Sequence, residues 1–183
     1  MAQKIRLKKT VALIGMMGAG KTAVGTALAR VLAVPFVDSD DEIVRAAGMS
    51  VAEIFARDGE SFFRAREGEV LRRLLSGPPA ILSTGGGAFL SAANRAAIAE
   101  HGVAVWLRAD LDLLWQRVRH KTTRPLLQTA DPRGTLAALL AARTPIYSEA
   151  GLAVDARADY SIDDTARAVL KALASRPDIL EPA

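Results

Sequence analysis

Eight residues, Gly15 to Thr22, match the phosphate-binding pattern G-x-x-x-x-G-K-[ST]. The pattern works where a strand ends in a loop that opens a helix, because the backbone N–H groups must converge on one point. The flanking residues fit this requirement. Residues 10–14 are apolar or β-branched, and Val24, Leu28 and Leu32 recur at helical spacing. The sequence therefore predicts a strand–loop–helix unit of an α/β fold.

Short apolar runs continue to alternate with helical stretches. Further strands are expected at 36–38, 80–84 and 103–107 and within 153–162, and helices at about 50–75, 91–100, 110–118 and from 136 onward. Ser50 with Glu53, Asp110, and either Asp163 or Asp164 provide N-caps. This order is typical of a parallel sheet with helices on both faces, whose ligands bind beyond the carboxyl ends of the strands.

The chain length predicts one domain over residues 1–183. The stretch at about 119–133 is polar, basic and broken by Pro125 and Pro132, so we expect a mobile lid loop there. We expect the tail, at about 177–183, to be flexible and frayed.

The composition excludes several classes of function. Without cysteines the chain forms no disulfide, no catalytic thiolate and no cysteine-bound zinc site, and two histidines are too few for a histidine-rich metal site. The formal charge of +4 suits an anionic ligand. With only 5% aromatic residues, no nucleic-acid partner is expected.

The sequence also predicts no membrane partner, because no apolar run approaches the roughly 18 residues of a spanning helix. Basic residues at 4–9 followed by an apolar run imitate a secretion signal. Three glycines and Lys21 then interrupt the apolar stretch, so a cytoplasmic enzyme is the better interpretation.

The glycine-rich loop predicts binding of a nucleoside triphosphate. Lys21 would reach the β- and γ-phosphates, and Thr22 would offer its hydroxyl to Mg²⁺. A small-molecule kinase, a GTPase switch and a motor or regulatory ATPase all use such a loop. The only asparagine, Asn94, is followed by Arg95, so the Asn-Lys-x-Asp guanine motif and the protein-kinase catalytic loop are both missing.

Two carboxylates follow the second expected strand, at Asp38 and Asp40. In an extended segment this spacing places both on one face, where one can hold a Mg²⁺-bound water and the other a substrate hydroxyl. Because Asp41 and Glu42 come next, an acid-rich helix N-terminus is an equally good interpretation.

Other candidates each have an ordinary alternative. Glu67 can orient Arg64 three residues away on a helix, or the two can form a surface ion pair. Three consecutive glycines, Gly85, Gly86 and Gly87, can let the backbone touch a ligand or can form a loose turn. Arg143 continues an apolar helix face, so it either reaches outward to solvent or points at a buried anion.

Arg117 and Arg124 flank the expected lid loop. They serve solubility, or they bring positive charge to a transferring phosphoryl group when the lid closes. Trp106 and Trp115 are most simply core residues.

The motifs GMMGAGKT, FVDSD, FFRAREGE, STGGGA, RPLL and ARTPIY occur in this order between Gly15 and Tyr147. In this combination the chain resembles the shikimate kinase family. The resemblance implies the fold of the nucleoside monophosphate kinases, a three-layer P-loop kinase fold with a five-stranded parallel sheet and a lid. It implies ATP- and Mg²⁺-dependent phosphorylation of the 3-hydroxyl of shikimate, a step toward chorismate and the aromatic amino acids.

The resemblance also implies roles by motif position. Asp40 would hold the reacting hydroxyl as base or orienter, and Arg64, Arg143 and the glycines Gly85, Gly86 and Gly87 would bind shikimate. Lys21 and Arg124 would stabilise the phosphates, Arg117 would lie over the adenine, and Thr22 and Asp38 would hold Mg²⁺. The ATP-binding set is Gly18, Ala19, Gly20, Lys21, Thr22, Ala23, Arg117 and Arg124, and the catalytic set is Lys21, Asp40 and Arg124.

Two alternatives stay open. One is another small-metabolite kinase, for a gluconate or a nucleoside, although paired arginines favour a carboxylate acceptor. The other is a regulatory ATP-binding module that drives a partner protein. The family's adenine-contacting segment is not recognisable at 154–157, so no adenine contact is assigned there, and a monomer is the expected state.

Overall fold

The protein, described here by a computed structural model over residues 5–121 and 124–182, is built on a five-stranded sheet. The strand order is β3 (Phe36–Asp38), β4 (Ile81–Ser83), β2 (Thr10–Ile14), β5 (Gly102–Arg108) and β6 (Leu152–Asp155), and each neighbouring pair is parallel. All five residues of the central strand β2 are buried, as expected for a parallel sheet covered on both faces. The predicted parallel sheet is confirmed.

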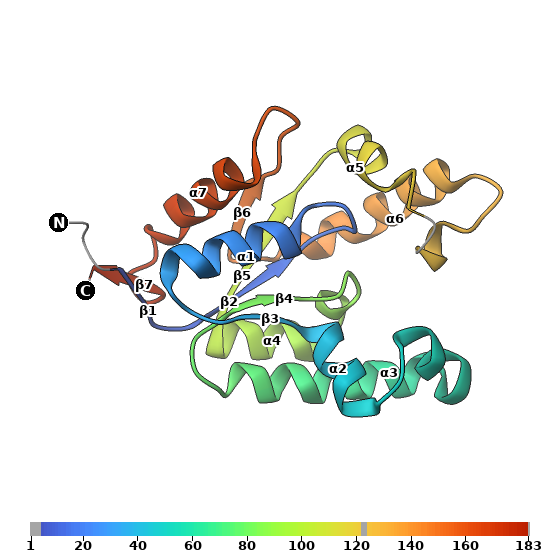
Figure 1. Cartoon of the computed structure of the whole chain (residues 1–183), viewed down its shortest axis with the longest axis horizontal. Helices are drawn as coiled ribbons and strands as arrows, with labels where there is room; N and C mark the ends of the chain where they lie inside the picture. Colours follow the sequence, from blue (N-terminus) through green and yellow to red (C-terminus); the bar gives the residue numbers. More distant parts are fainter. Residues whose placement is uncertain (1–4, 122–123, 183) are drawn as a thin grey trace.

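Helices cover both faces, so the predicted three-layer architecture is confirmed as well (Figure 1). On one face α1 (Lys21–Leu32) packs against α7 (Ile162–Leu173), and on the other α3 (Val51–Leu75) packs against α4 (Ala92–His101). α5 (Leu111–Val118) contacts α6 (Pro132–Tyr147) beyond the carboxyl end of the sheet. Two short 3-10 turns, η1 (Ala88–Leu90) and η2 (Pro125–Leu127), complete this end.

A helix, α2 (Ser39–Ala47), follows β3 directly, so of the two interpretations left open for Asp38 and Asp40, the acid-rich helix N-terminus is confirmed and the shared extended segment is wrong. Asp38 is the N-cap, and its Oδ1 accepts hydrogen bonds from the backbone N–H groups of Asp40 and Asp41. Acidic residues in a first helical turn interact favourably with the helix dipole. Local capping therefore decides the conformation, and Asp40 is a first-turn helical residue.

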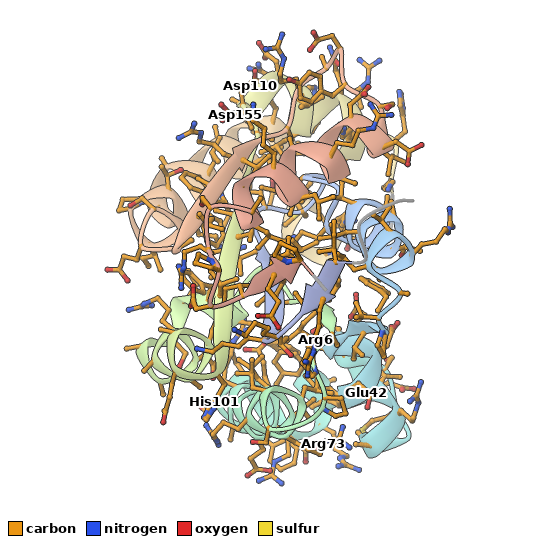
Figure 2. All side chains as sticks on the ribbon, turned by 90° about the vertical axis from the view of Figure 1, so that its left-hand side faces the viewer. Arg6, Glu42, Arg73, His101, Asp110 and Asp155 are labelled. Atoms are coloured by element: carbon orange, nitrogen blue, oxygen red, sulfur yellow. The ribbon has the colours of Figure 1, made fainter. Side chains whose placement is uncertain are left out.

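α3 begins with the predicted capping box between Ser50 and Glu53. Gly59 interrupts it with φ 84° and ψ 171°, a backbone conformation that disfavours residues with a Cβ. A small separate core of Ile43, Ile54 and Phe63 joins α2 to α3. An ion pair between Glu42 and Arg73 joins the same two helices at 2.9 Å (Figure 2).

The C-terminal segment differs from the frayed tail that the sequence predicted. β7 (Leu180–Pro182) pairs in antiparallel fashion with β1 (Ile5–Leu7), and Ile179 and Leu180 are buried. Lys8 reinforces the pairing, since its backbone N–H donates to the Ile179 carbonyl and its ammonium pairs with Glu181 at 3.2 Å. Burial of apolar side chains outweighs the usual fraying of a chain end.

Two further boundaries differ from prediction. Ser161, rather than Asp163 or Asp164, is the N-cap of α7, because Ser161 and Asp164 form a reciprocal capping box. Within the expected lid, α6 already begins at Pro132, which fits the first helical position because proline has no N–H to leave unpaired. Residues 122–123 of the lid lie outside the described residues. Among the helices described, none combines the length and the apolar character that crossing a bilayer requires.

Candidate active site

The predicted site residues converge at the carboxyl ends of three neighbouring strands. The glycine-rich loop follows β2, Asp38 ends β3, and the three glycines follow β4. Because β4 lies between β3 and β2, the glycines stand between the acidic pair and the phosphate-binding loop. Thr84 fixes this junction, since its backbone N–H and its hydroxyl both donate to the carbonyl of Leu13, at 3.3 and 3.1 Å.

The loop after β2 has the conformation that phosphate binding requires. Gly15, Gly18 and Gly20 all have positive φ, and a Cβ on Gly15 would lie 2.8 Å from the Leu107 carbonyl oxygen. α1 begins at Lys21, so the N–H groups of its first turn have no partner within the helix and face the loop. The Lys21 ammonium donates to the carbonyls of Gly15 and Met16, at 2.7 and 3.0 Å. The loop is thus preformed around its lysine.

Lys21 lies among charges of both signs. Burial lowers its pKa from 10.5 to about 8, with Arg124 and Arg143 acting in the same direction, whereas Asp40 and Asp38 raise it. The structure therefore brings the other four charged side chains within electrostatic reach of Lys21, although the five come from five different elements or loops.

The carboxyl groups of Asp38 and Asp40 are affected by similar electrostatic effects but differ in their hydrogen bonding. Burial is the main cause that raises the pKa of each, and each is raised further by a neighbouring aspartate. Oδ1 of Asp40 is buried and has no hydrogen-bond partner among the described residues. An unpartnered carboxylate oxygen surrounded by other charged side chains is an acceptor available to a ligand hydroxyl.

The fit to Mg²⁺ rests on the donor chemistry. Asp38 uses Oδ1 to cap α2, which leaves its second oxygen for a metal-bound water. Thr22 is exposed in the first turn of α1, next to the phosphate loop. No group of three or more His, Cys, Asp or Glu side chains suited to a metal occurs in the part of the chain described. Mg²⁺ in phosphotransferases usually keeps several waters and takes one or two protein oxygens plus phosphates, so this sparse set is compatible with it.

Each of the three glycines touches a different charged side chain. A Cβ on Gly85 would lie 2.9 Å from Oδ1 of Asp40, and one on Gly86 would lie 3.0 Å from Nη1 of Arg143. A Cβ on Gly87 would lie 2.5 Å from Nη2 of Arg64. The segment is therefore a closely packed backbone wall and not the loose turn that the sequence left open.

Arg64 and Glu67 form a partly buried ion pair, so the alternative of a surface pair is excluded. Glu67 is 1% exposed, whereas the Arg64 side chain is 36% exposed. Burial raises the pKa of Glu67, and Arg64 opposes that rise through its hydrogen bond and charge. The guanidinium is thus held by Glu67 through Nη1, Glu60 lies 3.6 Å from its Nε, and the side chain stays partly exposed.

The two arginines near the lid occupy different positions. Arg117 is exposed, and its Nη1 donates to the Gly18 carbonyl at 3.0 Å. Arg124 precedes η2, and its buried Nε has no hydrogen-bond partner among the described residues. Both side chains therefore lie beside the phosphate-binding loop.

Sequence reasoning missed two residues of this region. Thr84 has no role assigned from the sequence, where it occurs only within the STGGGA motif. Tyr147 was noted only as the end of a motif, yet its hydroxyl donates to the Gly86 carbonyl at 2.6 Å. The spacing of four from Arg143 on one helix was the available signal, since residues at that spacing are neighbours.

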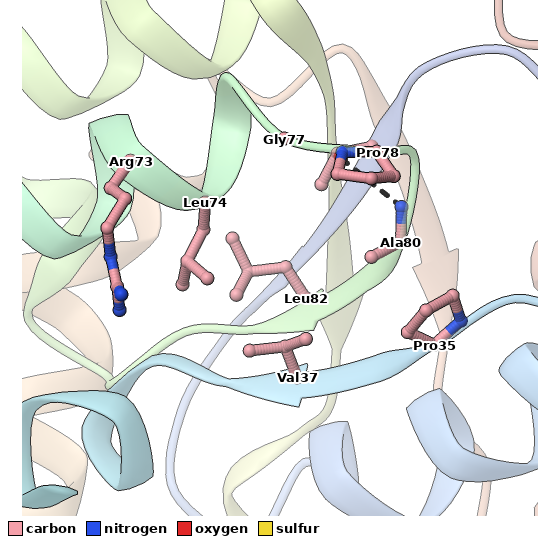
Figure 3. Close-up of a pocket in the computed structure, with 9 residues that line it drawn as sticks. Pro35, Val37, Arg73, Leu74, Gly77, Pro78, Ala80 and Leu82 are labelled. Carbon is pink, nitrogen blue, oxygen red and sulfur yellow. Dashed lines mark hydrogen bonds between the residues drawn. The ribbon is translucent and has the colours of Figure 1, made fainter.

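A hollow with a volume of about 210 Å³ lies at the opposite edge of the sheet (Figure 3). It opens beside the amino ends of β3 and β4, and Pro35, Val37, Leu74 and Leu82 give it an apolar lining. Its one charged lining residue, Arg73, is paired with Glu42. The convergent polar groups expected of an active site are at the other edge.

Comparison with known proteins gives a consistent picture. The family model described as shikimate kinase matches residues 17–174. A shikimate kinase of Cereibacter sphaeroides is 64% identical over 176 residues, which cover 96% of this chain and 88% of the relative. One from Ruegeria pomeroyi is 64% identical over 175 residues, covering 96% and 90%. The solved structure of shikimate kinase from Acinetobacter baumannii in complex with shikimate superposes with a TM-score of 0.86, at 39% identity, covering 91% of this chain and 93% of that one.

Proposed function

The chain belongs to the shikimate kinase family, and we propose that it transfers the γ-phosphoryl group of ATP to the 3-hydroxyl of shikimate. The observation that carries this proposal is the closely packed backbone segment of Gly85, Gly86 and Gly87, which we call the glycine wall. It sets a carboxylate, Asp40, and two guanidinium groups, those of Arg64 and Arg143, around one backbone segment beside the phosphate loop. A small acid with several hydroxyls needs a cation for its carboxylate and an acceptor for the reacting alcohol.

Asp40 orients the acceptor hydroxyl and takes its proton as the oxygen bonds to the γ-phosphorus. The bond from that phosphorus to the β,γ-bridging oxygen breaks, and ADP leaves with the bonding electrons. The unpartnered Oδ1 of Asp40 supports this role. The glycines Gly85, Gly86 and Gly87 bring the backbone close enough for the acceptor to lie against it.

The donor side uses the loop after β2. The backbone of Gly18, Ala19 and Gly20 and the first turn of α1, with Lys21, Thr22 and Ala23, surround the phosphates. Lys21 and Arg124 neutralise the charge that spreads over the phosphoryl oxygens in the transition state. Arg117 lies against the base of the nucleotide, a role supported by its contact with Gly18.

Thr22 and Asp38 would hold Mg²⁺, Thr22 through its hydroxyl and Asp38 through water. When bound, the ion neutralises phosphate charge and orients the phosphates. Lid residues at about 119–133 would close over the nucleotide and exclude water, which otherwise competes with shikimate as acceptor.

A coupled ADP-release assay with shikimate, gluconate and nucleoside monophosphates as acceptors tests the proposal. Turnover should depend on shikimate and should cease when the divalent cation is chelated. Preference for gluconate or a nucleotide would overturn the choice of acceptor. ADP release at full rate without any acceptor would favour a regulatory ATPase instead.

We further propose that the enzyme works as a monomer in the cytoplasm, without a nucleic-acid or membrane partner. The small net charge of +4 and the sparse aromatic content support the absence of a nucleic-acid partner. Sedimentation at working concentrations should give the mass of one chain, 19.4 kDa, and twice that mass would contradict the proposal.

A further inference from the structure

Tyr147 is the last residue of α6, one helical turn after Arg143, and none of its surface is exposed. Its hydroxyl donates to the Gly86 carbonyl at 2.6 Å, and its ring packs against Trp106 with the centroids 6.0 Å apart. The phenol is therefore held at both ends, by the sheet at its ring and by the glycine wall at its hydroxyl.

The guanidinium of Arg143 lies beside the same hydroxyl, since Nη1 of Arg143 and the Tyr147 oxygen both lie against Gly86, and burial raises the pKa of the phenol while the positive charge of Arg143 opposes that rise. A tyrosine hydroxyl has one proton and two lone pairs, so it can donate to Gly86 and accept from Arg143 at once. Gly86 leaves the space for this arrangement, because a Cβ there would lie 3.0 Å from Nη1 of Arg143 and 3.9 Å from the Tyr147 oxygen. The guanidinium, the phenol oxygen and the Gly86 backbone thus lie together, and the phenol is tied to that backbone by its hydrogen bond.

The two arginines of the cleft are held by groups of different charge. Arg64 is paired with the carboxylate of Glu67. The ion pairs of residues 5–121 and 124–182 do not include Arg143. A neutral phenol can orient a guanidinium without neutralising it, so Arg143 keeps its full charge for an anionic ligand.

Resting on the proposed function, we propose that Tyr147 is a positioning residue that orients Arg143 toward the carboxylate of shikimate, using the Gly86 carbonyl as its fixed point. Loss of the hydroxyl would leave the guanidinium charged but free to rotate. Affinity for the acceptor would fall, whereas the phosphate loop and the chemical step would be little affected.

The test is Tyr147→Phe, which removes one oxygen and keeps the packed ring. The KM for shikimate should rise by about tenfold, the scale of one lost hydrogen bond to a charged group. The kcat value and the KM for ATP should change little. The matched control is Tyr160→Phe, at the second tyrosine of the chain, which is 37% exposed. Its KM for shikimate should stay at the wild-type value.

A double-mutant cycle shows whether the hydroxyl acts through Arg143. Arg143→Ala alone should raise the KM for shikimate, and adding Tyr147→Phe to it should raise this KM no further. Calorimetric binding of shikimate gives the same comparison without turnover, and thermal melting of each variant separates lost binding from lost folding.

The outcomes separate this inference from the proposed function. If the wild-type protein does not phosphorylate shikimate, the proposed function fails. If it does, and Tyr147→Phe leaves the KM for shikimate unchanged, raises both KM values alike or adds its full effect to Arg143→Ala, the positioning role of Tyr147 is overturned.

Discussion

Glu67 holds Arg64 with both carboxylate oxygens, which lie 2.9 and 3.1 Å from Nη1 of the guanidinium. Two oxygens on one nitrogen restrict the rotation of the guanidinium, so its orientation is fixed before any ligand arrives. Preorganisation of this kind lowers the entropy lost on binding.

Arg64→Ala should therefore weaken binding of the acceptor selectively. We expect the KM for shikimate to rise roughly 10- to 100-fold, the scale of a lost charge-assisted hydrogen bond, with a much smaller change in the KM for ATP. Steady-state kinetics with each substrate varied in turn measures both values. Arg66→Ala is the control, because Arg66 is on the same helix and pairs with the exposed Glu69. Similar increases in both KM values would contradict the assignment.

Gly87→Ala tests the glycine wall without straining the backbone. Gly87 has φ −94°, which alanine adopts readily, but the new methyl group would lie 2.5 Å from Nη2 of Arg64. Because the end of an arginine side chain is flexible, the guanidinium should move and the fold should persist. We expect a several-fold higher KM for shikimate with almost the same Tm. Gly77→Ala, at the far end of α3, is the control, and an unchanged KM in Gly87→Ala would refute the steric argument.

Asp40→Asn should lose activity and gain stability. We expect kcat to fall at least ~10²-fold, the usual scale for a positioned acid–base group. The pKa of Asp40 is raised above its ordinary 3.8, so the ionised form is less favourable in the folded than in the unfolded state. Wild-type stability therefore decreases as the pH rises through the folded-state pKa, and asparagine avoids this loss.

Thermal melting at two pH values checks the stability part. The Tm of Asp40→Asn should exceed that of the wild type at neutral pH, and the difference should shrink as the pH falls toward and below the ordinary pKa of 3.8, where the aspartate is protonated in both the folded and the unfolded state. A less stable variant at neutral pH would show that the ionised aspartate stabilises the fold.

Because the pKa of Lys21 is lowered to about 8, we expect the enzyme to use ATP less efficiently at alkaline pH. The kcat/KM for ATP reports ionisations of the free enzyme, so it should fall as the pH rises, with a midpoint near this value. The arginine of the Lys21→Arg variant stays charged over this pH range, so the kcat/KM of the variant for ATP should not show this fall, even if its activity is lower. A wild-type profile that stays flat to about pH 9.5 would mean that the lysine keeps its ordinary pKa.

As the pH rises, the deprotonation of Lys21 should lower the activity but increase the stability of the folded protein. Its pKa in the folded state is below the unfolded value of 10.5, so the folded state binds this proton less tightly. The contribution of Lys21 to stability therefore increases as the pH rises from about 8 toward 10.5.

Local patterns were sufficient for much of the fold. The capping box at Ser50, the cap at Asp110 and the apolar run before Gly15 predicted their elements because each depends on residues within one or two turns. Where two local signals competed, the sequence left both interpretations open. At Asp38 the period-two spacing suggested an extended segment and the run of acidic residues a helix N-terminus, and the cap satisfied by two backbone N–H groups decided for the helix.

Contacts between distant segments could not be predicted in this way. The tail was expected to fray, because nothing in its own sequence shows that Leu180 will meet Leu7. The burial of Glu67 and the hydrogen bond from Tyr147 to Gly86, 61 residues away, likewise depend on contacts between segments that are distant in the sequence. Such pairs depend on which helices and strands pack together, and spacing along the chain does not record that.

The amino-acid sequence by itself determined the phosphate-binding loop, the order of strands and helices, and the residue types of the cleft, since backbone hydrogen bonding and hydrophobic periodicity act over short stretches. Only the tertiary structure decided that Gly85, Gly86 and Gly87 would each face one charged side chain, Asp40, Arg143 and Arg64 respectively. The strand order β3–β4–β2 and the packing of α6 bring these residues together, and both result from burying apolar surface over the whole domain.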